Sequence, residues 1–231
     1  MTLVLDDIRN FKTQAKNRRD LRRYESAVRI LDRAIALAKA NLPNGELHIV
    51  MAEELADCYA ILGGVERRWA LEVSGEERHL HLVKSIQAYD RAWEFESGDY
   101  GVVNSYGMLN RLVSRLLLKP DSLFTDGQTN FGENVTPLSM RDQLQDAAQR
   151  IQVQLDRPRR DDYWAMADLA LVNVLLEKEE PEVAYAGFLG KTPPEYAFKS
   201  VLDVLKPLAE LKWRLADKIA NAMKYLDRPV A

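Results

Sequence analysis

The sequence predicts an all-α protein of about ten helices paired as helical hairpins, and three observations indicate this class. First, apolar and small residues recur at helical spacing in two sets: Tyr59, Leu62 and Gly63, then Ser85, Tyr89 and Ala92. Second, we find no segment with the apolar and polar alternation of a half-buried strand. Third, the 11 glycines and 9 prolines fall mostly between periodic segments, where they mark corners.

In the first half, the helical period is interrupted by short turn signals. A first amphipathic helix is expected to turn Ile8 and Phe11 inward. The residues 43–45 form a Pro-Asn-Gly turn, and Ser74 and Glu77 have capping-box spacing, which predicts a new helix start. The expected helices cover residues 3–22, 24–41, 47–73, 74–97 and 100–118.

The second half begins with the longest irregular segment, residues 120–137, which is rich in Asp, Asn, Thr, Gly and Pro. We expect Phe124 and Phe131 to hold this loop against the body of the protein. Asp161 and Asp162 are expected to cap the following apolar helix. The helices expected here cover residues 140–155, 163–178, 181–189, 195–206 and 208–226, with a break at Pro207 and a frayed tail at 227–231.

Composition and charge exclude several classes of protein. The net charge is −3 at pH 7 and the sequence has one cysteine, Cys58, so no basic field suggests nucleic acid and no internal disulfide can form. We see no signal peptide and no apolar run long enough for a membrane span. We therefore expect a cytoplasmic protein in which residues 1–231 form a single domain, with neither nucleic acid nor membrane as a partner.

No pattern of residues indicates catalysis, a cofactor or a metal. His79 and His81 are two residues apart, so on a helix they point to different sides. Cys58 lies within an apolar helix, which favours a buried thiol over a nucleophile. The Gly63-Gly64 pair lacks the flanking residues of a phosphate-binding loop, and we interpret it as a site of close helix packing. The sequence predicts that the protein is not an enzyme.

The large–Leu–Gly set at Tyr59 and the small–aromatic–Ala set at Ser85 resemble the two helices of a tetratricopeptide (TPR) hairpin. More specifically, residues 52–211 resemble the TRAF-binding region of apoptosis signal-regulating kinases and related bacterial TPR proteins. The likeness is carried by YAILGG, by SIQAYDRAWEFESGD and by the apolar helix YWAMADLALVNVLLEK. It implies a TPR-like α-solenoid that serves as a regulatory module and binds other proteins.

In a TPR array, the first helix of each hairpin lines a concave groove. Aligning Tyr59 and Tyr106 with the large position of that helix predicts six groove residues: Asp57, Arg67, Arg68, Asn104, Arg111 and Arg115. Arginines favour carboxylates through paired hydrogen bonds, so the expected partner is a protein or peptide with acidic groups.

Two other functions stay open at this point. The same arginines suit a small-ligand or nucleotide sensor with a basic pocket inside the superhelix. A structural oligomerisation domain is the second alternative, and the sequence does not define an oligomeric state.

The first expected helix is rich in basic residues, which include Arg22 and Arg23. They suit a docking face for an acidic partner or a membrane surface, or else a solvated helix face.

Overall fold

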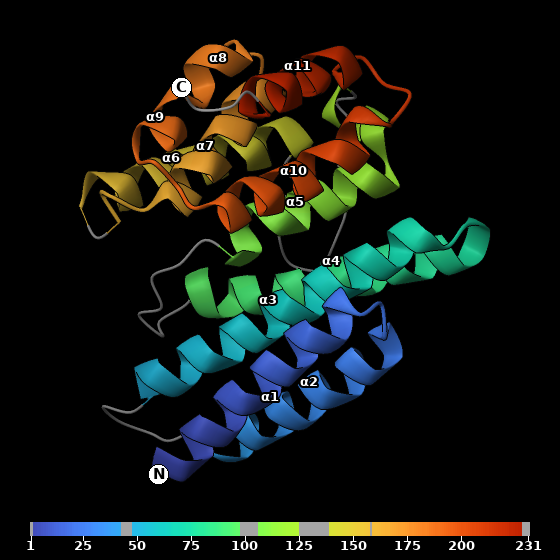
Figure 1. Cartoon of the computed structure of the whole chain (residues 1–231), viewed down its shortest axis with the longest axis vertical. Coiled ribbons are helices and arrows are strands. Elements are labelled where there is room, and N and C mark those ends of the chain that lie inside the picture. Colours follow the sequence, from blue (N-terminus) through green and yellow to red (C-terminus); the bar gives the residue numbers. More distant parts are fainter. Residues whose placement is uncertain (1, 43–47, 98–105, 125–138, 158, 228–231) are drawn as a thin grey trace. The chain divides into compact units, whose positions relative to one another are not determined.

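The computed structural model describes residues 2–42, 48–97, 106–124, 139–157 and 159–227, and these residues are all-helical (Figure 1). The predicted all-α class is therefore confirmed. The chain divides into two compact units, residues 1–118 and 119–231, each described separately below. The expectation of one domain over residues 1–231 stays a prediction.

The first unit contains five helices that pack in the order of the chain. They are α1 (Thr2–Asp20), α2 (Tyr24–Ala40), α3 (His48–Glu72), α4 (Gly75–Ser97) and α5 (Tyr106–Leu118). Each helix contacts the next, and α1 and α5 also contact α3. The short connections after α1 and α3 form the hairpins α1–α2 and α3–α4 (Figure 1).

The core of the first unit includes the residues that carry the helical period. Ile8, Leu31, Leu55 and Ala92 are buried, each with no more than 1% of its surface exposed. Gly63 meets the ring of Tyr89 so closely that a Cβ atom at this glycine would lie 2.7 Å from the ring. The expected close helix packing at Gly63 is therefore confirmed.

The second unit contains the remaining helices: η1 (Pro120–Leu123), α6 (Met140–Asp156), α7 (Tyr163–Leu175), α8 (Pro181–Ala184), α9 (Ala186–Gly190), α10 (Glu195–Ala209) and α11 (Ala216–Leu226). Asp162 caps α7 by accepting hydrogen bonds from the amides of Trp164 and Ala165. Asp161 does not cap this helix but pairs with Lys191 at 2.5 Å. The predicted cap is thus one residue and not two.

Two predicted helix boundaries in the second unit are wrong. Pro207 lies inside α10, where its missing N–H removes one hydrogen bond in the last turn while its ring is buried. The helix then ends at Ala209, and the indole Nε1 of Trp213 donates to the carbonyl of Leu208 at 2.8 Å. This side-chain bond satisfies an acceptor at the helix end, and the last helix begins only at Ala216.

The segment predicted as a loop over residues 120–137 begins with the short helix η1, which buries Leu123. The ring of Phe124 packs beside Trp213 with centroids 6.4 Å apart, and the guanidinium of Arg214 lies over it. Phe124 thus contacts the body of the second unit while 36% of its surface is exposed. Phe131 and the tail beyond residue 227 lie outside the described residues.

Candidate functional site

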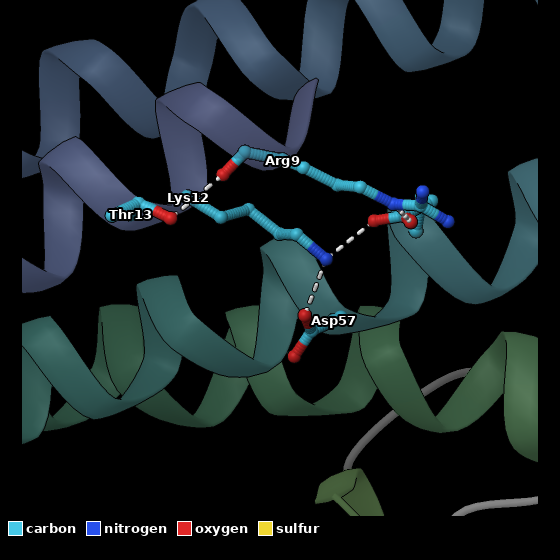
Figure 2. Close-up of polar contacts among 5 residues, drawn as sticks. Arg9, Lys12, Thr13 and Asp57 are labelled. Atoms are coloured by element: carbon cyan, nitrogen blue, oxygen red, sulfur yellow. Dashed lines mark hydrogen bonds and ion pairs between the residues drawn. The ribbon is translucent and has the colours of Figure 1, made fainter. Parts of the chain in front are cut away.

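The seam between α1 and α3 is held by ion pairs, and Asp57 is part of it. Lys12 donates to the carboxylate of Asp57 at 2.6 Å and also bonds to Glu54, as Figure 2 shows for Lys12 and Asp57. Arg9 donates to Glu54 at 2.7 Å. The Lys12 and Glu54 side chains are only 13% and 9% exposed, so these charges are largely removed from water.

Burial and pairing act in opposite directions on these groups. Burial alone raises the pKa of Glu54, but the hydrogen bonds from Lys12 and Arg9 outweigh it, and the net pKa is lowered. Burial likewise opposes the charge of Lys12, but the charge of Asp57 and the hydrogen bonds outweigh it, and the net pKa of Lys12 is raised. Both groups therefore keep their charges at neutral pH, and the pairs tie α1 to α3.

The seam continues toward the ends of the same two helices. Arg68 donates to Asp20 at 3.1 Å, and Glu72 lies 3.4 Å from Arg22. Along the seam, residue numbers rise in the same direction in both helices, so α1 and α3 run parallel. In stacked helical hairpins, consecutive helices are expected to run antiparallel, and every second helix is expected to run parallel.

On its other side, α3 meets α4 and α5. Arg67 donates to the side chain of Asn110 on α5 at 2.9 Å, and its guanidinium lies 5.6 Å from the Tyr89 ring centroid on α4. Ser85 donates to the carbonyl of Gly63 at 2.8 Å and bonds to Ser114 at 2.9 Å. A buried polar link therefore joins the three helices where their backbones approach closely.

Arg111 and Arg115 both point from α5 toward Asp90 on α4. Arg115 donates to both carboxylate oxygens of Asp90 at 3.0 Å, and its side chain is 7% exposed. Arg111 lies 3.7 Å from the same carboxylate, and its guanidinium lies 4.6 Å from the centroid of the Trp93 ring. These two arginines hold α5 against α4.

Five of the six residues predicted to line the groove are described, and they lie in two places. Asp57 and Arg68 face α1, whereas Arg67, Arg111 and Arg115 face α4 and α5. Asn104 lies outside the described residues. The sequence pattern did not indicate the side chains that pair with these five residues, which include Lys12, Asp20, Asp90 and Asn110.

A separate basic hollow lies where α1 turns into α2. It has a volume of about 380 Å³ and is lined by Arg22, Arg23, Tyr24, Glu25, Ser26, Arg29 and Trp69. Arg22 has a left-handed backbone with φ of 57°, and the amide of Arg23 donates to the carbonyl of Arg18 at 2.8 Å. These bonds close α1 and turn the chain directly into α2.

The aromatic floor of the hollow rests on a buried contact between a histidine and a carboxylate. Trp69 stacks between Tyr24 and His81, with ring centroids 5.9 Å and 3.9 Å apart. His81 Nδ1 lies 2.5 Å from the carboxylate of Glu66, and both residues are 4% exposed. Burial, the largest cause, and the hydrogen bond to Glu72, the next largest, raise the pKa of Tyr24 to about 12. The Tyr24 hydroxyl therefore stays protonated and donates to Glu72.

The described residues contain no group of three or more His, Cys, Asp or Glu side chains that could hold a metal ion. Cys58 is buried, and burial raises its pKa to about 12, which suppresses the reactive thiolate. Among the helices that the structure describes, none combines the length and apolar character that a membrane span needs.

Comparison with known proteins gives no relative: no family model matches the chain, and no curated protein or solved structure matches it significantly. The class of protein therefore follows only from the geometry above. The described residues define an all-helical protein whose first unit is held together by charged contacts between its helices.

Proposed function

We propose that the protein is a non-catalytic interaction module whose first unit is a TPR-like array of helical hairpins and binds a protein partner. One observation carries this proposal: contacts between the parallel helices recur at a nearly constant distance in sequence. Across the α1–α3 seam, the paired residues are 42 to 50 positions apart, and Arg67 and Asn110 across α3–α5 are 43 apart. A constant offset is what a stack of similar repeats produces.

The spacing is longer than the ~34 residues of a standard TPR. Across α1–α3 the spacing spans the 19-residue α1, the 17-residue α2 and the connections after them, and across α3–α5 it spans parts of the 25-residue α3 and the 23-residue α4. These helices are long for such a hairpin. The characteristic contact is nevertheless present, since Gly63 of α3 faces Tyr89 of α4 beside Ser85. This contact supports the TPR-like proposal in the absence of any matching family.

The partner surface that we propose is the one formed by the parallel helices α1, α3 and α5. Among the predicted groove residues Arg68, Arg111 and Arg115, the side chain of Arg68 is the most accessible, at 34%, compared with 15% for Arg111 and 7% for Arg115. An acidic peptide would therefore meet Arg67 and Arg68 on α3, while Arg111 and Arg115 keep α5 in place. Asp57 orients Lys12 and shapes the α1 side of the surface.

Affinity purification from the native cell, with the full chain as bait, tests the function. The identified partner is then captured with the wild type and with Arg67→Ala/Arg68→Ala. We expect about tenfold weaker capture, because arginines of this kind often dominate an interface. The control is Arg150→Ala, which removes a similarly exposed arginine that pairs with Asp146 in α6.

Circular dichroism must show that both variants fold. Equal capture by Arg67→Ala/Arg68→Ala and wild type would show that the groove lies elsewhere. If no protein is captured but a nucleotide raises the melting temperature, the protein is a small-ligand sensor and the proposal is wrong.

A further inference from the structure

The basic hollow at the start of α2 has a rigid floor. Tyr24 is 7% exposed and stacks on Trp69, which in turn stacks on the buried His81. The Tyr24 hydroxyl donates to Glu72 at 2.6 Å, which links α2 to the end of α3. A site with a fixed floor loses little conformational entropy when a ligand binds, so the hollow is preorganised.

The side chains that line the hollow carry a net positive charge. Its lining contains three arginines and one glutamate. Arg22 lies 3.4 Å from Glu72 and Arg29 lies 3.7 Å from Glu25, but all of these side chains except Glu72, at 35%, are more than two-thirds exposed. Such exposed pairs contribute little and exchange readily. Arg23 has no ion-pair partner among the described residues.

These groups suit a doubly charged oxyanion. Arginine binds phosphate oxygens through two parallel N–H donors, and three arginines around one hollow can surround a phosphate dianion. The first turn of the 17-residue helix α2 adds to this, because its N-cap residue, Arg23, makes no side-chain capping bond. Glu25 is the one acidic residue in the lining and would repel a bound anion.

The surroundings favour a phosphate that is carried by a larger molecule. The hollow is open to solvent and, at about 380 Å³, is larger than a phosphate group alone requires. Trp69 supplies part of the aromatic floor, and the neighbour of Arg22 in sequence, Leu21, is 63% exposed. An aromatic and an arginine at one site are the residue types that most often anchor a protein partner.

We propose that this hollow binds a phosphorylated side chain of the protein partner. The inference that the partner is a protein rests on the function proposed above, whereas the inference that it carries a phosphate rests on the hollow itself. The binding site would make partner capture depend on phosphorylation, and it would be distinct from the groove residues Arg67 and Arg68.

The direct test uses the full chain labelled for NMR at neutral pH and constant ionic strength. The probe is N-acetyl-O-phosphoserine amide, compared with N-acetylserine amide, N-acetylglutamate amide and inorganic phosphate. We expect saturable shifts of the backbone amides of residues 24–26 and of the Arg23 side chain, with a Kd on the order of 1 mM for so small a ligand. The unphosphorylated serine probe should give no shifts.

Arg23→Gln/Arg29→Gln should weaken phosphoserine binding by about tenfold or more, because each removes a charged donor. The matched control is Arg33→Gln, the same change one turn further along α2, where Arg33 lies over Phe11 instead. Equal binding by Arg23→Gln/Arg29→Gln and wild type overturns the proposal. Equal binding of the glutamate probe, or of inorganic phosphate, overturns the assignment to a phosphorylated side chain.

Capture of the partner separates this proposal from the proposed function. Loss of capture after phosphatase treatment of the partner, and with Arg23→Gln/Arg29→Gln, supports the phosphate site. If the treated partner is still captured, the module function stands and the phosphate proposal is wrong. If the wild type captures no protein while phosphoserine still binds, the function is wrong and the partner-borne assignment fails with it.

Discussion

The contact between Gly63 and Tyr89 predicts that alanine substitutions at two adjacent glycines of α3, Gly63 and Gly64, change stability in opposite directions. The two glycines have different surroundings. An added Cβ at Gly63 would lie 2.7 to 2.8 Å from three ring atoms of Tyr89. Ordinary carbon contacts are about 3.5–4.0 Å, so the overlap is severe. At Gly64 the nearest atom is the Tyr89 hydroxyl at 3.4 Å, at the free end of the side chain.

The Tyr89 ring cannot easily move away from a new methyl group. It is 3% exposed, and Arg67 lies over it, 5.6 Å from the ring centroid. Overpacking of a core usually costs about 1–3 kcal/mol, whereas alanine gains about 1 kcal/mol over glycine within a helix. Three close contacts place Gly63→Ala at the upper end of that range, so we expect a net loss of about 2 kcal/mol. Gly64→Ala should gain about 0.5–1 kcal/mol.

Urea unfolding of the full chain, followed by circular dichroism, measures both changes. A second test is Tyr89→Leu, which removes the ring: Gly63→Ala should cost much less in this background than in the wild type, since the clash is gone. Our account of the helix packing is refuted if Gly63→Ala is as stable as Gly64→Ala. It is also refuted if the cost of Gly63→Ala is the same with leucine at position 89.

Three further predictions concern buried polar groups. Because the pKa of Glu54 is lowered from its ordinary 4.5, its pairing stabilises the fold above that pH and is lost as pH falls through the lowered value. Lys12→Met should therefore cost about 1–3 kcal/mol at pH 6, and this cost should shrink as the pH falls through the lowered pKa of Glu54. Exposed Lys16→Met should show no such change, and urea unfolding over a series of acidic pH values measures both variants. The buried Tyr185 hydroxyl has no hydrogen-bond partner among the described residues, so Tyr185→Phe should keep or raise stability by up to about 1 kcal/mol in thermal unfolding. With its pKa raised to about 12, Cys58 should react with a thiol reagent at pH 8 at least about 100-fold more slowly in the native protein than in denaturant, and fast native labelling would contradict its burial.

The fold class was predictable because it depends on local patterns. Helical spacing identified the faces of α3 and α4, and the small residue Gly63 correctly indicated where their backbones approach. Asp162 was recognisable as a cap because its side chain acts within three residues. Each of these interactions is short in sequence or repeats along one face, so the residue order alone contains the signal.

The pairing of charges was not predictable in the same way. Arg68 meets Asp20 across 48 positions, and Arg115 meets Asp90 across 25. Which carboxylate an arginine reaches depends on the register between two helices, and helical spacing does not determine that register. The helix end near Pro207 was missed for a related reason, because the indole bond from Trp213 to Leu208 depends on how the turn folds back.

The two basic regions of the first unit should respond differently to salt. Arg115 is nearly buried and holds Asp90 through two 3.0 Å bonds, and such pairs are screened only weakly. Arg22 and Arg29 lie in exposed pairs of 3.4 Å and 3.7 Å, where ions compete effectively. A partner that binds through the hollow is therefore released by salt while the α4–α5 contact stays intact. A partner that requires Arg115 must first take it from Asp90 and so loosen α5, which makes the hollow the less costly place for an acidic ligand to bind.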